Sequence, residues 1–460
     1  MRLIKKMLVA MTLFMVTSCG FFSPVDIIAN STMISPYSYG LAKAKTGLEQ
    51  YQVLLKTHQA AIAAGVDVDY SGIKRIDIDI PDIFTPIPLT QSNDFKGCVI
   101  TVKNTQKRVY LFTASRKGMN VSVPKNRIDT GDFNSVPELA RGKVLLMIED
   151  DNPWVKDRRG YNYGHQRKDI LLVEKSKALN RVVMPYNNSY SNPKCTYLMA
   201  NEKPIVVKNL FVNRSSASSF ITNVLSVDGY NDVRISDITI KTPDSDLNGD
   251  VAIRVQNSTN VTFTDITIIG TYSQKGKYGY GVSLDNVWNF RAKRMLGKGN
   301  WGIFGNNNVN TATIEDSEIN RFDIHCYGRD VSFQNVKFFD LYNQFSSVYG
   351  RVLFEKCEFR NFTPVLIETS YNAYTEFNVN INDCVFYTTS QKNYLVSTGS
   401  LSGEDNPRPE LKTKKLPIVN VKGLKVISLE TGEEKKQVDV FLKKGKFIEE
   451  RNIQNVIRLL

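Results

Sequence analysis

A six-residue motif returns through the middle of this 460-residue chain and limits the folds available to it. Each copy has an apolar residue at its first and sixth positions and polar residues at its second and third. The copies occupy residues 235–240, 263–268, 314–319, 333–338, 354–359 and 381–386. Repeats spaced by roughly 20 to 50 residues indicate a solenoid, because one short segment cannot bury its apolar side alone, whereas stacked copies form a continuous core.

Weaker copies extend the array. Phe290-Arg291-Ala292 divides the longest gap between copies, and Lys208-Asn209-Leu210 precedes the first strong copy. The segments are rich in β-branched and aromatic residues, and the sequence between them shows no apolar stripe at helical spacing. Asn, Asp and Gly are frequent at the breaks. The array therefore predicts short strands joined by turns of variable length.

This pattern resembles the right-handed parallel β-helices of the pectin-lyase-like superfamily over roughly residues 200–430. The resemblance implies an all-β right-handed parallel β-helix that acts on or binds a polysaccharide, since the superfamily contains lyases, glycoside hydrolases, esterases and phage tailspikes. The lipobox-like Val16-Thr17-Ser18-Cys19, a helical pattern over residues 41–64 and the repeat array follow one another in the chain. This order is similar to that of exported polysaccharide lyases of gut Bacteroidetes. One fold hosts many functions, so the activity has to be argued from the site.

The N-terminus predicts export. Basic residues precede an apolar stretch over residues 7–16, which is too short to span a bilayer as a mature helix. Val16-Thr17-Ser18-Cys19 resembles a bacterial lipobox, which implies a signal peptide over 1–18, a lipidated Cys19 and a tether over 19–40. The alternative is an ordinary cleaved signal with an incidental cysteine. We expect an outer-membrane lipoprotein, at the cell surface or on the periplasmic face, that meets the membrane only through its lipid anchor.

The chain is strongly basic, with a formal net charge of +13 and a pI of about 9.2. A basic exported protein commonly meets an acidic partner, and no nucleic-acid-binding motif is present. We therefore expect a monomer that binds an acidic polysaccharide. The cysteines beyond Cys19 lack metal-ligand spacing, so no metal site is predicted, although solenoid geometry could assemble a calcium site that sequence hides. Cys357 and Cys384 hold equivalent repeat positions and predict stacked buried thiols or, alternatively, a disulfide.

The remaining segments divide by pattern. Apolar residues at helical spacing predict a helix over 41–64 within a capping region over 41–69, with His58 packed on its apolar side. Residues 70–430 predict the β-helix with insertions, and 431–460 a C-terminal cap. A loop over 154–168 interleaves basic and aromatic residues. Its Arg159 and His165 suit an anionic sugar, although such a loop can also be merely solvated.

The richest cluster of reactive side chains lies on a second strand that precedes the motif in each coil. Side chains alternate along a strand, so inward Phe322 and Ile324 predict outward Asp323 and His325. Counting back from the motif aligns Asn306 with His325 and Ser346, and Phe304 with Asp323 and Gln344, with Glu368 nearby.

The residue types around His325 suit β-elimination from a uronic-acid polymer. This reaction needs a group that neutralises the carboxylate, a base for the C5 proton and an acid for the leaving oxygen at C4. Histidine suits the base, tyrosine the acid and arginine the carboxylate. We expect the following catalytic roles: His325 as base, Asp323 or Glu368 to orient it, Tyr349 or Tyr371 as acid, and Arg321 or Arg329 as the neutralising cation. The expected substrate-binding residues are Lys298, Trp301, Asn306, Arg329, Asn343, Gln344, Tyr371, Asn372, Arg159 and His165.

Two other functions fit the same sequence. Paired carboxylates such as Asp323 and Glu368 would support a glycoside hydrolase. A noncatalytic glycan-binding surface lipoprotein would need only the polar outer lines. For a lyase, charge and resemblance favour glycosaminoglycans such as chondroitin or hyaluronan, and then pectins.

Overall fold

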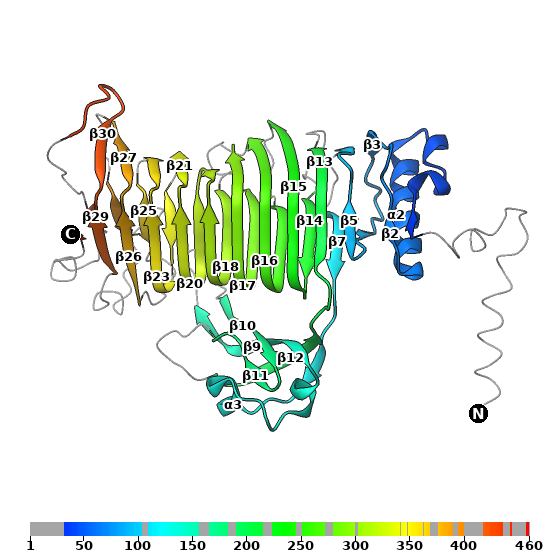
Figure 1. The fold of residues 1–460 in the computed structure, drawn as a ribbon, viewed down its shortest axis with the longest axis horizontal. Coiled ribbons are helices and arrows are strands. Elements are labelled where there is room, and N and C mark those ends of the chain that lie inside the picture. The colour runs from blue at the N-terminus through cyan, green and yellow to red at the C-terminus, as the bar shows by residue number, and fades with distance from the viewer. Residues whose placement is uncertain are drawn as a thin grey trace, which may run out of the picture.

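A computed structural model describes residues 32–103, 109–155, 165–182, 190–214, 223–244, 251–271, 279–299, 302–340, 342–346, 348–361, 363–368, 376–389, 394–399, 417–435, 442–443 and 457–459. Figure 1 shows a long solenoid with helices at its N-terminal end and a small domain projecting from one side.

The solenoid is a right-handed parallel β-helix, as the repeat and the resemblance predict. Each strand pairs in parallel with its counterpart on the next coil (Figure 1). Its strands are β3 (Arg75–Ile78), β4 (Ile87–Pro88), β5 (Ser92–Asp94), β6 (Val99–Val102), β7 (Tyr110–Ser115), β13 (Ile205–Arg214), β14 (Asn223–Asp228), β15 (Asn231–Asp244), β16 (Val251–Thr271), β17 (Tyr280–Lys298), β18 (Gly302–Glu315), β19 (Glu318–Ile319), β20 (Phe322–Gln334), β21 (Lys337–Asp340), β22 (Asn343–Phe345), β23 (Val348–Glu355), β24 (Glu358–Asn361), β25 (Val365–Glu368), β26 (Glu376–Asn382), β27 (Val385–Thr388), β28 (Val396–Gly399), β29 (Ile418–Lys422), β30 (Lys425–Ser428), β31 (Leu442–Lys443) and β32 (Ile457–Leu459).

Inward side chains form apolar columns along the solenoid. One column, read from the strand register, consists of Val233, Val261, Phe290, Ala312, Val331, Val352, Val379 and Val419. Phenylalanine rings also follow one another from coil to coil, with Phe304 and Phe322 at 5.2 Å between ring centroids. Truncating such a buried ring to alanine typically costs about 3–5 kcal/mol.

The motif that recurs in the sequence is a strand, a sharp bend and a second strand. All six third positions adopt left-handed backbone, with φ between 48° at Asp316 and 57° at Asp265. Asn and Asp tolerate this conformation better than most residues, which explains their frequency there. The weak copy at 290–292 was misplaced by two residues, because Ala292 pairs with Phe263 and the bend falls at Arg294, where φ is 54°.

The two repeat cysteines confirm the expectation of stacked thiols. Cys357 and Cys384 are buried and free, and the Cys357 backbone N–H donates to Cys384 Sγ at 3.3 Å.

Helices cover the N-terminal end of the solenoid. They are η2 (Pro36–Tyr39), η3 (Leu41–Lys43) and α2 (Gly47–Ala64), beside the strand pair β1 (Met33–Ile34) and β2 (Asp67–Val68). The α-helix begins at Gly47 rather than at residue 41, because Thr46 and Glu49 form a capping box there. His58 is buried as predicted, with Nδ1 at 2.9 Å from Pro88 O and Nε2 at 2.7 Å from Tyr70 Oη. Within the described residues, no helix is long and apolar enough to cross a membrane.

Residues 116–200, called the insertion below, interrupt the solenoid between β7 and β13. They form an antiparallel sheet ordered β11-β10-β9-β12-β8 with its own buried core. The elements are β8 (Met119–Val121), α3 (Lys125–Thr130), η4 (Pro137–Ala140), β9 (Lys143–Val155), β10 (His165–Glu174), β11 (Lys177–Ala178) and β12 (Pro193–Met199). The sequence predicted insertions among irregular coils here. It did not reveal one separate sheet, because alternating short strands look alike in both settings.

The insertion rests on the bends of the solenoid. Trp288 packs against a second apolar cluster of the insertion. The side chains of Asn308 and Asn310 donate to backbone oxygens of Lys168 and Arg181, the second at 2.8 Å. These contacts fix the insertion beside β17 and β18.

Candidate functional site

Polar side chains gather on the outer face of the strands that precede the motif. The register places Gly305, Asp323 and Gln344 next to one another on three coils. The predicted alignment of Asp323 with Gln344 is confirmed. The predicted neighbour Phe304 was wrong, because it pairs with Phe322 and turns into the core.

His325 occupies an irregular step in this register. Strand β18 pairs Asn306 with Ile324 and Asn307 with Cys326, which leaves His325 as an extra residue between the two pairs. The expected column through Asn306 and His325 was therefore wrong by one residue. A bulge of this kind re-aims a side chain. The His325 side chain is 15% exposed, so it is held by its neighbours and still reaches the surface.

Tyr280, at the start of β17, completes the cluster. Its hydroxyl donates to Asp323 Oδ2 at 2.9 Å and lies 2.9 Å from His325 Nε2. The ring reaches across the intervening coil because Gly305 leaves room for it: a Cβ at that position would lie 2.6 Å from Tyr280 Cγ. Tyr280 was not predicted from the sequence. The small residues Gly302 and Gly305 were the available signal that a ring lies over this coil.

Buried partners hold Asp323 in place. The carboxylate is fully buried, and its Oδ2 accepts from Arg321 and lies 3.0 Å from His325 Nε2. Burial alone would raise the pKa of Asp323, but Arg321, His325 and the Tyr280 hydroxyl outweigh it and lower that pKa. Asp323 is thus ionised at neutral pH and faces the imidazole.

The sequence suggested Arg321 as a cation that neutralises a substrate carboxylate, but its buried position prevents this role. Its side chain is 1% exposed, it donates to Gln344 Oε1 at 2.9 Å, and its guanidinium lies 4.6 Å from the centroid of the Tyr342 ring. Gln344 is itself fully buried and donates to Ser346 Oγ at 3.3 Å. Both residues position the cluster and cannot bind polymer directly.

Two further predicted binding residues are buried. Asn306 lies in the inward column between Leu284 and Ile324, so it cannot meet a polymer. Asn343 accepts from the Phe322 backbone N–H at 2.9 Å and donates to Pro364 O at 3.0 Å, which makes it a backbone support. Both are fully buried, and the expectation that they bind substrate was wrong.

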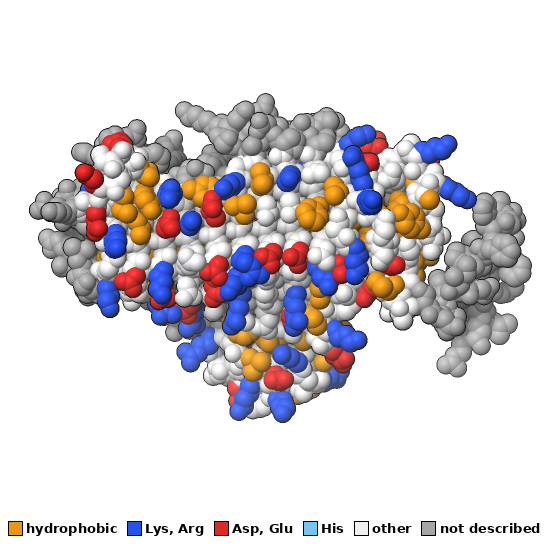
Figure 2. All heavy atoms as spheres, turned by 45° about the horizontal axis from the view of Figure 1, so that its top comes forward, with side chains coloured by type: hydrophobic (Ala, Val, Ile, Leu, Met, Phe, Trp, Pro, Cys, Tyr) orange, Lys and Arg blue, Asp and Glu red, His pale blue; other side chains and the backbone are white. Residues whose placement is uncertain are grey.

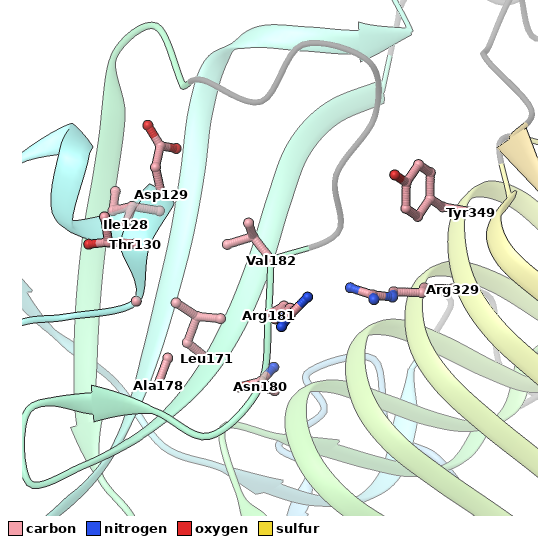
Figure 3. Close-up of a pocket in the computed structure, with 11 residues that line it drawn as sticks. Ile128, Asp129, Thr130, Leu171, Ala178, Asn180, Arg181, Val182, Arg329 and Tyr349 are labelled. Atoms are coloured by element: carbon pink, nitrogen blue, oxygen red, sulfur yellow. The ribbon is translucent and has the colours of Figure 1, made fainter.

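Other predicted residues lie apart from His325. Lys298 is half-exposed and forms an ion pair with Glu318 at 2.8 Å. Arg329 and Tyr349 line a cleft of about 540 Å³ between the solenoid and the insertion. Figure 3 shows both side chains pointing toward the insertion. Tyr349 is therefore replaced by Tyr280 as the tyrosine beside His325.

Several predicted residues lie outside the described parts of the structure. These are Cys19, Arg159, Trp301, Tyr371 and Asn372, together with the side chains of His165 and Glu368. Their expected roles stay predictions. Among the residues that are described, no group of three or more His, Cys, Asp or Glu side chains could hold a metal ion.

Comparison with solved structures finds similar chains at low identity. The tailspike protein gp49 of Pseudomonas phage LKA1 has 12% identity and a TM-score of 0.48, covering 86% of this chain and 76% of that one. The Gp54 tailspike of Acinetobacter baumannii bacteriophage AP22, solved with a capsular saccharide, has 13% identity and a TM-score of 0.43, covering 88% and 71%. The A-module of the Azotobacter vinelandii mannuronan C-5 epimerase AlgE4 has 8% identity and a TM-score of 0.32, covering 90% and 99%.

The parallel β-helix architecture rests on the strand pairing of this chain, and these distant likenesses carry no statement about activity. No protein-family model matches the sequence, and no curated protein matches it. The resemblance to lyases of gut Bacteroidetes is not tested by these comparisons and stays a prediction.

Proposed function

We propose that this protein is a polysaccharide lyase that cleaves a uronic-acid-containing polymer by β-elimination at the Tyr280–His325 pair. The observation that carries the proposal is the contact of Tyr280 Oη with His325 Nε2 at 2.9 Å, on a partly exposed surface above a buried carboxylate. Two proton-transfer groups so close together can serve the C5 proton and the leaving O4 of one sugar.

The hydrogen bonds assign a role to each atom. Ionised Asp323 accepts a hydrogen bond from His325 Nε2–H, which makes Nδ1 the basic nitrogen. Nδ1 takes the C5 proton, the C4–O4 bond breaks as the C4=C5 bond forms, and the Tyr280 hydroxyl gives its proton to O4. The Nε2 proton then passes to the tyrosine oxygen, and exchange with water moves the remaining imidazole proton from Nδ1 back to Nε2 for the next turnover. Asp323 stabilises the transient imidazolium, as a carboxylate does in a Ser-His-Asp triad.

An amide beside His325 suits the substrate carboxylate. Asn307 pairs with Cys326, directly past the bulge, and the Nδ2–H group of its side chain can donate to a carboxylate. An amide hydrogen bonded to the uronate carboxylate helps to delocalise charge as the C5 proton leaves. We assign this role to Asn307 in place of Arg321.

A glycoside hydrolase is less well supported. That reaction needs one carboxyl group that holds a proton and a second that is ionised and reaches the sugar. Asp323 is ionised, as its lowered pKa indicates, but it is fully buried beneath Tyr280 and His325. It cannot contact a sugar directly.

We extend this proposal to the substrate polymer and to the location of the protein. The net charge of +13 favours an acidic polymer, and we propose a glycosaminoglycan such as chondroitin or hyaluronan. We also propose that Cys19 is lipidated and anchors the protein to the outer membrane, which metabolic labelling with a fatty-acid probe in wild type and in Cys19→Ala would test.

The activity test uses the protein without residues 1–19 and a panel of uronate polymers, each with and without calcium. Absorbance of unsaturated uronates should rise on at least one polymer, and His325→Ala should abolish the rise. New reducing ends without that absorbance would identify a hydrolase and contradict the lyase. Binding without any change in polymer length would identify a glycan-binding protein.

A further inference from the structure

The cleft between the insertion and the solenoid has features that the Tyr280–His325 pair does not use. Its volume is about 540 Å³. One wall comes from the insertion, at α3, β10 and the segment after β11. The other comes from Arg329 on β20 and Tyr349 on β23 (Figure 3). The two solenoid residues are adjacent in the strand register.

Two cations face each other across this cleft. Figure 3 shows the guanidinium groups of Arg181 and Arg329 pointing toward one another, while Asp129 lies on the far side. Arg329 Nε donates to Asp330 Oδ2 at 3.2 Å, which leaves the end of its guanidinium for other partners. Arg181 is exposed and forms no ion pair with a carboxylate in the described ranges. Two converging guanidinium groups suit a carboxylate or sulfate.

The rest of the lining suits a sugar ring. Tyr349 supplies an aromatic ring beside the cations, and buried Ile128, Leu171 and Val182 supply an apolar base. Binding sites commonly combine an apolar lining with a few converging polar groups. The wall that carries Arg181 is fixed, because Asn310 donates to Arg181 O at 2.8 Å. The cleft is therefore formed before any ligand arrives.

We propose that this cleft is an accessory subsite that binds a carboxylate- or sulfate-bearing sugar of the polymer. Arg329 follows His325 by four residues on the same coil, so their Cα atoms are at most about 14 Å apart. One polymer chain can thus reach both places. The choice of an acidic glycan as ligand rests on the proposed function, whereas the affinity for an anion rests on Arg181 and Arg329 alone.

The test measures binding by calorimetry in the His325→Ala background, where no lyase turnover degrades the ligand. The probes are an unsulfated chondroitin oligosaccharide and its sulfated counterpart, which separate carboxylate from sulfate recognition. Arg181→Gln and Arg329→Gln should each weaken binding of at least one probe about tenfold, since one charged contact contributes roughly 1.4 kcal/mol. Arg141→Gln, at an exposed arginine of the insertion outside the cleft, should bind like the parent.

Equal affinity for the cleft variants and Arg141→Gln would overturn the proposal, and so would failure of the parent to bind either probe. Arg181 is exposed and carries the test alone if Arg329→Gln does not fold. The two proposals also fail separately. If wild type shows no lyase turnover but the cleft variants selectively lose binding, the subsite stands and the lyase is rejected. If wild type shows lyase turnover but the cleft variants bind like the parent, the lyase stands and the subsite is rejected.

Discussion

Two kinds of ion pair lie on the outside of the same solenoid. Asp265 and Arg294 join neighbouring bends through bonds of 2.6 and 2.7 Å, and both side chains are nearly half exposed. Arg321 and Asp323 are also paired, but they are buried beneath Tyr280. Along the face in Figure 2, Lys and Arg alternate with Asp and Glu, as expected for pairs of the first kind.

The difference in burial between the two pairs indicates which side chains are held in a fixed geometry. Exposed pairs typically contribute about 0–1 kcal/mol, because water screens them and ordering their long side chains costs entropy. A buried pair costs more to desolvate and persists only when further hydrogen bonds satisfy it. Asp323 Oδ2 has three such partners in Arg321, Tyr280 and His325, whereas its Oδ1 is buried without a hydrogen bond among the described residues. We therefore expect the chemistry to take place beside the buried pair, where Asp323 faces His325, and not at the exposed pairs.

Breaking the buried pair should give the largest effect on stability. Asp323→Asn leaves the Arg321 charge buried without its carboxylate, so we expect the free energy of unfolding to fall by about 3–5 kcal/mol. Urea denaturation at neutral pH measures this change. Asp265→Asn is the matched control, and an equal loss in the two variants would remove the distinction between the pairs.

Displacing the tyrosine ring should impair turnover while leaving that ion pair in place. In Gly305→Ala the new Cβ would lie 2.6 Å from the Tyr280 ring, compared with 3.1 Å for Gly302→Ala. We expect kcat to fall about 100-fold in the first variant, because Tyr280 Oη leaves His325, and by less in the second. Steady-state kinetics would check this order. The reverse order, with Gly302→Ala more damaging, would contradict the placement of the ring.

His58, which is buried and uncharged, should make the free energy of unfolding depend on pH, in contrast to the exposed ion pairs. Burial lowers the pKa of His58 to about 4, whereas an unfolded histidine titrates near about 6.5. The unfolded state therefore binds a proton as the pH falls below about 6.5, and the folded state does not until about 4. Stability is full above that window and falls within it, by about 3 kcal/mol in total.

Denaturation across pH 4 to 7 measures this loss. His58→Gln keeps one donor and one acceptor for Pro88 and Tyr70 and should flatten the profile in this range. An unchanged slope in the variant would assign the acid sensitivity to other groups.

The smallest effect belongs to the exposed pair. A double-mutant cycle with Asp265→Asn and Arg294→Gln should give a coupling energy below about 1 kcal/mol. High salt should reduce it further, because the Debye length shrinks to about 3 Å at 1 M. A coupling above 2 kcal/mol that resists salt would show that exposure does not separate the two classes.

The sequence predicted the solenoid well because every coil requires a similar bend and a similar spacing of apolar residues. An Asp or Asn at most of the bends, as at Asp237 and Asp383, and apolar residues at fixed offsets mark the coils. The weak copy near Phe290 was misplaced because Arg294 occupies its bend, and arginine is not a typical residue for left-handed backbone.

The site was predicted only in part. Asp323 and His325 were found because they are neighbours in one strand. Tyr280 was missed because it lies on an earlier coil and reaches across Gly305, a contact that no local pattern encodes. The inward turn of Asn306 was missed because the bulge at His325 shifts the register by one residue, and a one-residue shift exchanges the two faces of a strand.

The most direct test of the account is the turnover of Tyr280→Phe on the polymer that wild type degrades. This change keeps the ring over Gly305 and removes only the hydroxyl between Asp323 and His325. We expect kcat to fall by about 10² to 10⁴ while the free energy of unfolding changes by no more than about 1.5 kcal/mol. Tyr387→Phe, beneath Arg360 on the outer surface, should keep wild-type kcat. Turnover by Tyr280→Phe within threefold of wild type would contradict the central claim.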